Sequence, residues 1–178
     1  QGVYAFNDRV AAPFFAPAGL NRGGLPIVRS EFKVTQALRD KLYDNKVNPI
    51  ATFPRVGPVA YGQKTLQKKA SALDRINVRR LLISLKNFIG DTSKNLVFEQ
   101  NTTVTRNRFL NAVNPFLESV QQRQGLFAFR VVMDESNNTP DVIDRNQLVG
   151  QIFIQPTKTA EFIILDYTIQ PTGATFND

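Results

Sequence analysis

Two short segments of this 178-residue sequence hold the side chains that come closest to a chemical site. The first begins with Asp134-Glu135-Ser136-Asn137-Asn138-Thr139, a run rich in the oxygen ligands that Ca²⁺ prefers. A calcium loop of the EF-hand type needs a glycine at its sixth position and a bidentate Glu at its twelfth. Those positions here hold Thr139 and Arg145. We therefore interpret this segment as a structural loop without a metal ion.

The second segment is the glycine-rich run Gly19-Leu20-Asn21-Arg22-Gly23-Gly24. It lacks the Gly-Lys-Ser/Thr ending of a phosphate-binding loop and does not lie cleanly between a strand and a helix, so we interpret it as a turn. The sequence has no His and no Cys, which removes His-based triads, thiol nucleophiles, zinc clusters and disulfides. The carboxylates are scattered along the chain. Acid–base catalysis stays open as an alternative only if the fold brings two of them together. We expect no enzyme and no cofactor.

Composition and charge are those of a single soluble domain with an excess of base. Hydrophobic residues make up 42% and charged residues 21%, and 22 Lys and Arg against 15 Asp and Glu give a formal charge of +7. That excess fits either an ordinary solvated surface or an acidic partner. No run approaches the roughly 18–20 apolar residues of a membrane span, so we expect no membrane contact. Because the chain begins at Gln1 and its single Met is Met133, we expect a piece of a longer product.

The first half of the chain predicts an irregular segment followed by short elements. Residues 1–30 are rich in Pro and Gly and predict an extended leading segment. Thr35 is a suitable cap for a short helix that reaches about Asn45, with Leu38 and Leu42 on its inner face. Residues 50–53 and 59–62 predict two short strands around a proline-bounded turn.

Two long amphipathic helices are the clearest prediction. The first begins at Asp74 or Asn77 and runs to about Ile89, where Gly90 is expected to end it. The second begins at Thr103 or Thr105, reaches about residue 124 and ends before Gly125, with a kink or a lost backbone bond at Pro115. The apolar stripes of the two helices are Val78, Leu81, Leu82, Leu85 and Ile89 in the first, and Phe109, Leu110, Val113, Phe116, Leu117 and Val120 in the second.

The remaining segments predict strands. Residues 96–99 are a short candidate, and residues 126–133 place Phe127, Phe129, Val131 and Met133 on one face. Residues 148–155 and 160–170 are expected to pair as a hairpin, and residues 134–145 to form a long polar loop. Together these elements predict an α+β fold in which two long helices flank a mixed β-sheet.

Several runs of residues, spread in order over essentially the whole chain, resemble the C-terminal part of tail sheath proteins from contractile-tailed phages, most closely the T-even-like group. They are Ala16-Pro17-Ala18-Gly19-Leu20-Asn21-Arg22-Gly23, Tyr43 through Pro49, Gly62-Gln63-Lys64-Thr65, Ser71-Ala72-Leu73-Asp74-Arg75-Ile76-Asn77-Val78-Arg79-Arg80-Leu81, Phe98-Glu99-Gln100-Asn101, Asn137 through Asn146 and Phe162-Ile163-Ile164-Leu165.

The resemblance implies a structural subunit, assembled in the host cytoplasm into a virion tail. Such a subunit would polymerise in stacked sixfold rings around a tail tube, with the baseplate and the tail terminator at the ends, and would contract to drive the tube through the host envelope. Its terminal segments would add strands to neighbouring subunits, because edge strands offer unpaired backbone groups. We expect residues 1–30 to lead into a domain at 31–170, and residues 171–178 to begin a C-terminal arm.

The resemblance also implies a helix that faces the tube with complementary charge. We expect Arg106, Arg108 and Arg123 on the second long helix to make this contact, because the first two are cations at the positive end of a helix dipole. A rival location is the first long helix, and the same Arg residues could instead form ordinary ion pairs. The rival residues are Arg75, Arg79 and Arg80.

A basic nucleic-acid-binding module is the alternative from another class of protein. Its support is the +7 charge. Such a module would need exposed aromatic side chains along a basic stripe, whereas the 14 Phe fall mostly on the apolar faces described above. We therefore expect no nucleic-acid partner, and a gel-shift assay with a salt titration would distinguish the two readings.

Overall fold

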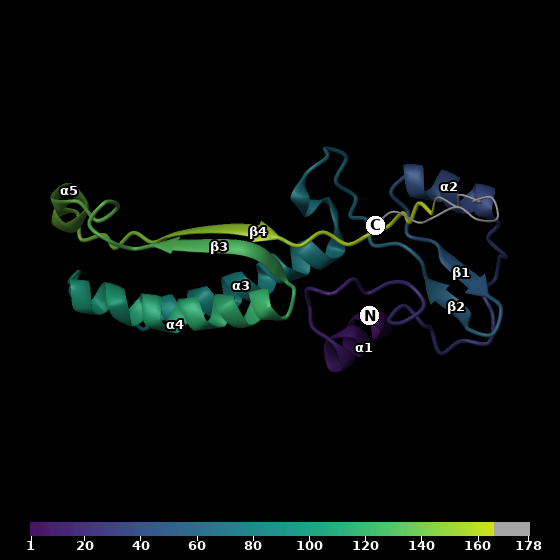
Figure 1. The fold of residues 1–178 in the computed structure, drawn as a ribbon, viewed down its shortest axis with the longest axis horizontal. Coiled ribbons are helices and arrows are strands. Elements are labelled where there is room, and N and C mark those ends of the chain that lie inside the picture. The colour runs from purple at the N-terminus through teal and green to yellow at the C-terminus, as the bar shows by residue number, and fades with distance from the viewer. Residues whose placement is uncertain (166–178) are drawn as a thin grey trace, which may run out of the picture.

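The computed structural model of the chain describes residues 1–165 (Figure 1). In chain order its elements are α1 (Gly2–Val10), α2 (Gln36–Asp44), β1 (Ile50–Phe53), β2 (Gly57–Ala60), the 3₁₀ turn η1 (Ala72–Asp74), α3 (Ile76–Lys94), α4 (Thr103–Gln122), β3 (Leu126–Val132), α5 (Pro140–Asp144) and β4 (Gln151–Pro156).

The larger part of the fold is a two-layer sandwich. Helices α3 and α4 lie side by side along one face of the β3–β4 ribbon, and α2 with β1 and β2 lies at the opposite end of the molecule from α5 (Figure 1). The predicted stripes of both helices supply the core. Its buried side chains include Leu81 and Leu85 from α3, Phe109, Val113, Leu117 and Val120 from α4, Leu126 from β3, and Met133, the residue after β3.

The sheet prediction is right in class and wrong in arrangement. The fold is α+β, as expected, but the described residues contain two separate antiparallel pairs, β1–β2 and β3–β4, and no mixed sheet. Strand β4 pairs with β3, and none of the described residues that follow β4 pairs with it in the expected hairpin. Residues 160–165 form no strand, and residues 166–178, which include the rest of that predicted strand and the predicted arm, lie outside the described residues.

A bulge explains why Phe127 does not lie on the face of β3 that was predicted for it. The register with β4 shifts between Leu126 and Ala128, which places an extra residue in β3. Leu126 therefore enters the core while Phe127 is 71% exposed. The alternation then resumes, and Phe129 and Val131 pack against the core as predicted.

Helix α3 runs five residues past Ile89, so Gly90 does not end it. The hydroxyls of Thr92 and Ser93 donate to the carbonyl oxygens of Phe88 and Ile89, at 2.9 and 2.7 Å, and stay within the helix. The chain then turns, and Leu96 enters the core. The strand predicted at 96–99 is therefore a turn.

Helix α4 ends close to the predicted place but by a different device. Gln124, not Gly125, adopts the left-handed conformation (φ 65°), and the N–H of Gly125 donates to the Val120 oxygen at 2.9 Å. Gly125 is needed for close packing, because a Cβ there would lie 2.8 Å from the Phe14 ring. The helix continues through Pro115, which leaves the Asn111 carbonyl without its usual donor.

The leading segment is helical at its start. Helix α1 occupies residues 2–10, so the prediction of an extended segment is wrong there, and the irregular part begins only where Pro and Gly become frequent. Tertiary contacts fix α1, since the buried Asn7 donates to the Ala12 oxygen at 2.8 Å. Residues 19–24 run alongside β2, and Gly24 forms an antiparallel bridge with Val59.

The short elements largely match their predictions. Thr35 caps α2 by accepting from Leu38 N–H, as expected, but the Leu38 side chain is 41% exposed and no residue of α2 is fully buried. Strand β1 lies where predicted and β2 starts two residues early. Helix α5 interrupts the polar loop at residues 134–145, and β4 starts three residues late.

Candidate functional site

Among residues 1–165 no group of acidic side chains is arranged to hold a metal ion, and no helix is long and apolar enough to cross a membrane. The loop that follows β3 uses its polar groups internally. Asp134 Oδ1 accepts from the Ser136 amide at 2.8 Å and from its hydroxyl. Asn138 bridges to Val149, donating to its oxygen and accepting from its N–H, both at 2.9 Å. These bonds give the loop a structural role.

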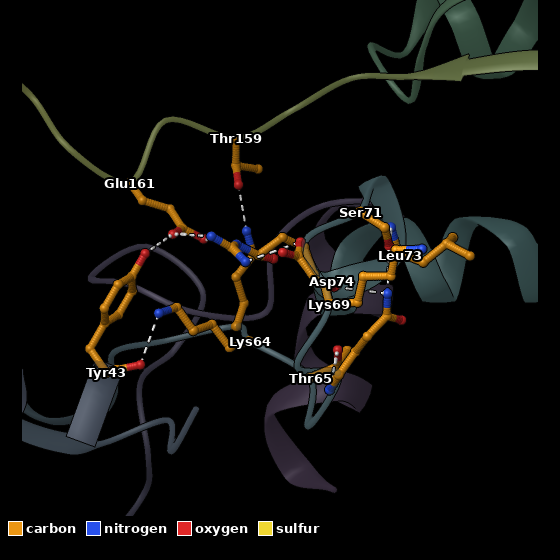
Figure 2. Close-up of polar contacts among 12 residues, drawn as sticks. Tyr43, Lys64, Thr65, Lys69, Ser71, Leu73, Asp74, Thr159 and Glu161 are labelled. Carbon is orange, nitrogen blue, oxygen red and sulfur yellow. Dashed lines mark hydrogen bonds and ion pairs between the residues drawn. The ribbon is translucent and has the colours of Figure 1, made fainter. Parts of the chain in front are cut away.

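A set of long-range polar contacts lies where the segment after β4 crosses the start of α3 (Figure 2). We call Tyr43, Lys64, Arg75 and Glu161 the clasp. Arg75 is the residue before α3, Tyr43 lies in the last turn of α2, and Lys64 lies between β2 and η1. Glu161 belongs to the extended segment after β4. The clasp therefore joins three parts of the chain that are far apart in sequence.

Glu161 is the centre of the clasp. Its Oε1 accepts from Arg75 Nε at 2.6 Å, and its Oε2 accepts from Arg75 Nη2 at 3.0 Å and from the Tyr43 hydroxyl at 2.8 Å (Figure 2). A two-pronged guanidinium–carboxylate pair of this kind fixes direction as well as distance. The Phe162 ring meets the Tyr43 ring edge-on, with 5.7 Å between centroids.

Backbone bonds on either side of Arg75 also hold it in place. Arg75 forms a β-bridge with Lys64, Thr65 N–H donates to the Asp74 oxygen at 3.0 Å, and Ile76 N–H donates to the oxygen of Gln63 at 2.8 Å. The Gln63 side chain also donates to the Thr159 hydroxyl. This Gln63–Thr159 bond ties the segment after β4 to the connection between β2 and η1, at a point two residues before Glu161.

The electrostatics of the clasp favour the ionised form of Glu161. Burial acts to raise the pKa of Glu161, but hydrogen bonds from Arg75 and Tyr43 outweigh it and hold the pKa below its usual value. Burial raises the pKa of Tyr43, and the bond to Glu161 raises it further. Burial also lowers the pKa of Lys64, whose Nζ donates to the Tyr43 carbonyl at 2.8 Å.

The clasp fixes the position from which the next residues of the chain extend. After Glu161 comes the run Phe162-Ile163-Ile164-Leu165, whose side chains are all largely exposed, up to 86% at Ile164. Exposed apolar side chains in series mark a contact surface more often than isolated ones do. The clasp thus holds the base of an apolar segment that the described residues leave uncovered.

A second anchor holds the leading helix on α3. Arg80 Nη2 donates to both oxygens of Asp8, at 2.7 and 2.6 Å, and its guanidinium lies 4.9 Å from the centre of the Tyr4 ring. Arg123 donates to the Ala11 oxygen at 3.2 Å. Three of the Arg residues predicted to face outward therefore make internal contacts: Arg75, Arg80 and Arg123.

The other three candidates differ in exposure. Arg106 is 6% exposed, so its expected place on the outer face of α4 is wrong. The loop after β3 and the segment before β4 cover the start of α4, where Asn101 Nδ2 donates to the Gln147 oxygen at 2.9 Å. Arg79 and Arg108 are exposed, and no carboxylate of residues 1–165 forms an ion pair with either.

Glu161 and Asp8 were missed by sequence reasoning, because their partners lie 86 and 72 residues away and no local pattern links them. Tyr43 and Lys64 lie within runs that carry the resemblance to tail sheath proteins, and that was the available signal.

Comparison with known proteins gives a consistent result. Residues 68–170 match the family described as phage tail sheath C-terminal domain. The chain is 43% identical over 176 residues to a tail sheath protein of Vibrio phage KVP40 and 40% identical over 178 residues to that of Enterobacteria phage T4. These alignments cover 98% and 99% of this chain but only 26% and 27% of the two relatives, so the chain spans about a quarter of their length.

Solved structures of contractile assemblies are also similar. The sheath complex of an extracellular contractile injection system (PVC), in its contracted state, superposes with a TM-score of 0.86 at 29% identity, over 94% of this chain and 49% of that one. A chain of the anti-feeding prophage baseplate superposes with a TM-score of 0.84 at 26% identity, over 95% of this chain and 48% of that one.

Proposed function

The chain belongs to the phage tail sheath protein family, and we propose that it forms part of a structural subunit that polymerises in stacked sixfold rings around a tail tube. The observation that carries this proposal is the similarity, over 94% of the chain, to the sheath complex of a contractile injection system in its contracted state. On this proposal the subunits rearrange during contraction as nearly rigid bodies and drive the tube through the host envelope. The energy resides in the assembled lattice, so the subunit itself performs no covalent chemistry.

The terminal segments would connect neighbouring subunits. Within the described residues β3 and β4 pair only with each other, so each offers one edge of unpaired N–H and C=O groups. An extended segment of a neighbouring copy can satisfy such an edge by adding a strand. The exposed run at residues 162–165 is a source of such a segment, and the clasp fixes the direction in which it leaves.

The tube contact is best assigned to the Arg residues that stay free. Arg108 on α4 and Arg79 on α3 are exposed and have no carboxylate partner among residues 1–165, so their guanidinium groups are available to an acidic face. Arg123 is exposed but already bonded to the Ala11 oxygen. The baseplate and the tail terminator would bind the ends of the polymer, and assembly would take place in the host cytoplasm.

Electron microscopy of the full-length product tests this function. We expect tubular polymers with sixfold symmetry when the full-length protein is expressed, and we expect the 178-residue chain alone to be monomeric or weakly associated in sizing chromatography. Full-length protein that stays monodisperse at high concentration, with or without tail tubes, would refute the proposal.

A further inference from the structure

A pocket lies beside the clasp, between the start of α3 and the segment after β4. Ser71, Asp74 and Asn77 line it from one side, and Lys158, Thr159 and Glu161 from the other. Figure 2 shows the connection that carries Ser71 and Asp74 facing the segment that carries Thr159 and Glu161. The clasp uses only one edge of this space, so the rest of the pocket has no role in the contacts described above.

Asn77 is the unusual residue of the pocket. It is 3% exposed, and its Oδ1 accepts no hydrogen bond from any described residue. A buried amide oxygen without a donor costs about 1–3 kcal/mol, so side chains of this kind are normally paired. The buried Asn138 is the contrasting case, because its amide makes hydrogen bonds through both its oxygen and its nitrogen.

The start of α3 adds unpaired donors to the same pocket. Arg75 precedes the helix without capping it through its side chain. The N–H of Ile76 donates to Gln63 and that of Arg79 to Arg75. Asn77 and Val78 lie between them in the first turn of α3, where backbone N–H groups have no partner within the helix, and the Arg75 side chain does not cap them. Both of these residues line the pocket, which therefore presents an unpartnered acceptor and two donors that no bond within α3 uses.

The charges around the pocket favour a neutral ligand. Two carboxylates, Asp74 and Glu161, are balanced by two cations, Arg75 and Lys158, and Arg75 is within 3.1 Å of both carboxylates. A free anion would meet the carboxylates, and a free cation would meet the helix start, where the dipole is positive. A residue in an extended segment presents its N–H and its C=O on the same side, and both groups are neutral, so together they supply the donor and the acceptor that the pocket lacks.

We propose that this pocket binds the main-chain N–H and C=O of one residue in an extended segment from a second copy of this chain. The N–H of that residue donates to Asn77 Oδ1, and its C=O accepts from the N–H groups at the start of α3. The choice of a second copy rests on the proposed function, because a polymer of one chain holds the extended segments of neighbouring copies at high effective concentration. The pocket is thus a recognition site for main chain, separate from the edges of β3 and β4.

The test is Asn77→Ala in the full-length protein, compared with Asn138→Ala. Because the unpaired Asn77 Oδ1 makes no stabilising hydrogen bond in the single chain, N77A should melt no lower than the wild type before assembly, whereas N138A should melt at lower temperature. In sedimentation assays of polymer formation, N77A should raise the critical concentration about fivefold to tenfold, the effect of one hydrogen bond per contact. An unchanged critical concentration would overturn the proposal.

Hydrogen exchange on the wild type gives a second measurement that needs no variant. The amides of Asn77 and Val78 should exchange rapidly in the unassembled protein and become protected at least tenfold in polymers. Protection before assembly would mean that the chain's own residues fill the pocket, and absence of protection in polymers would mean that nothing binds there. Either result refutes the inference while the polymers themselves still support the proposed function. A wild type that forms no polymer would refute both.

Discussion

Replacing Glu161 by Gln should loosen the segment after β4 without disturbing the core. The substitution keeps the shape of the side chain but replaces the carboxylate, which accepts hydrogen bonds from Arg75 and Tyr43, by a neutral amide. Hydrogen bonds to charged groups contribute about 1.5–3 kcal/mol when buried. The side chains of Arg75 and Glu161 remain 26% and 20% exposed, so solvent screening reduces this contribution. We expect a loss of about 1–2 kcal/mol in the free energy of unfolding.

Two assays at pH 7 measure the effect. The thermal midpoint of E161Q should fall by about 3–6 °C, as expected for a domain of this size. Trypsin should cleave faster after Lys158, which is exposed and lies next to the tethered residues. Asp91→Asn is the matched control, because the Asp91–Lys94 pair is 72–77% exposed and its loss should change neither readout. If E161Q melts and digests like this control, the clasp does not hold the segment.

The pH dependence gives an independent check on the same reasoning. Although burial raises the pKa of Glu161, bonds from Arg75 and Tyr43 hold it below its usual value. A carboxyl with a lower pKa in the folded state stabilises that state above its unfolded pKa, and the contribution is lost as the pH falls through the folded pKa. The difference in thermal midpoint between wild type and E161Q should be constant near neutrality and shrink below about pH 4. A difference that grows on acidification would contradict this assignment.

Three further outcomes follow from the structure. Arg80→Met should free α1 from Asp8 and speed tryptic cleavage at Arg9, with a fall of about 1 kcal/mol in stability, and equal cleavage rates would count against this anchor. Arg106→Glu should lower the thermal midpoint strongly, because position 106 is buried. Arg108→Glu, at an exposed position, should keep the midpoint and weaken binding to tail tubes in a low-salt pelleting assay. Normal sheathing by Arg108→Glu would show that Arg108 does not contact the tube. EDTA, ATP and divalent metals should leave the melting temperature of the chain unchanged in a thermal-shift assay, and a shift of several degrees with any of them would reveal a ligand site.

The sequence pattern predicted those features of the fold that depend on residues close together in the chain. The stripes of α3 and α4 follow the helical period over several turns, and Thr35 is a cap whose partner lies three residues away. The errors arose where distant residues decide. Phe127 lies outside because the register with β4 shifts beside it, and α3 continues through Gly90 because nothing there adopts the left-handed conformation that ends a helix.

The candidate surface shows the same limit. Helical periodicity places Arg106 and Arg108 near each other at the start of α4, but only tertiary structure tells which of them a neighbouring loop covers. The resemblance carried the family assignment, since no catalytic or metal motif competed with it. The clasp could not be predicted, because the partners of Glu161 among residues 1–165 lie at least 86 residues away from it in the sequence.

The two anchors have a common consequence for how the domain would carry load. Arg75 holds the segment after β4, and Arg80, five residues further along, holds the leading helix, so both ends of the described chain are tied to the first turns of α3. Force applied at either end therefore reaches α3 before it reaches the β3–β4 ribbon. The stripe of α3 packs into the core through Leu81 and Leu85, directly after these anchors. A domain tied in this way can shift as one body when neighbouring subunits pull on its ends, and the contraction proposed here requires that behaviour.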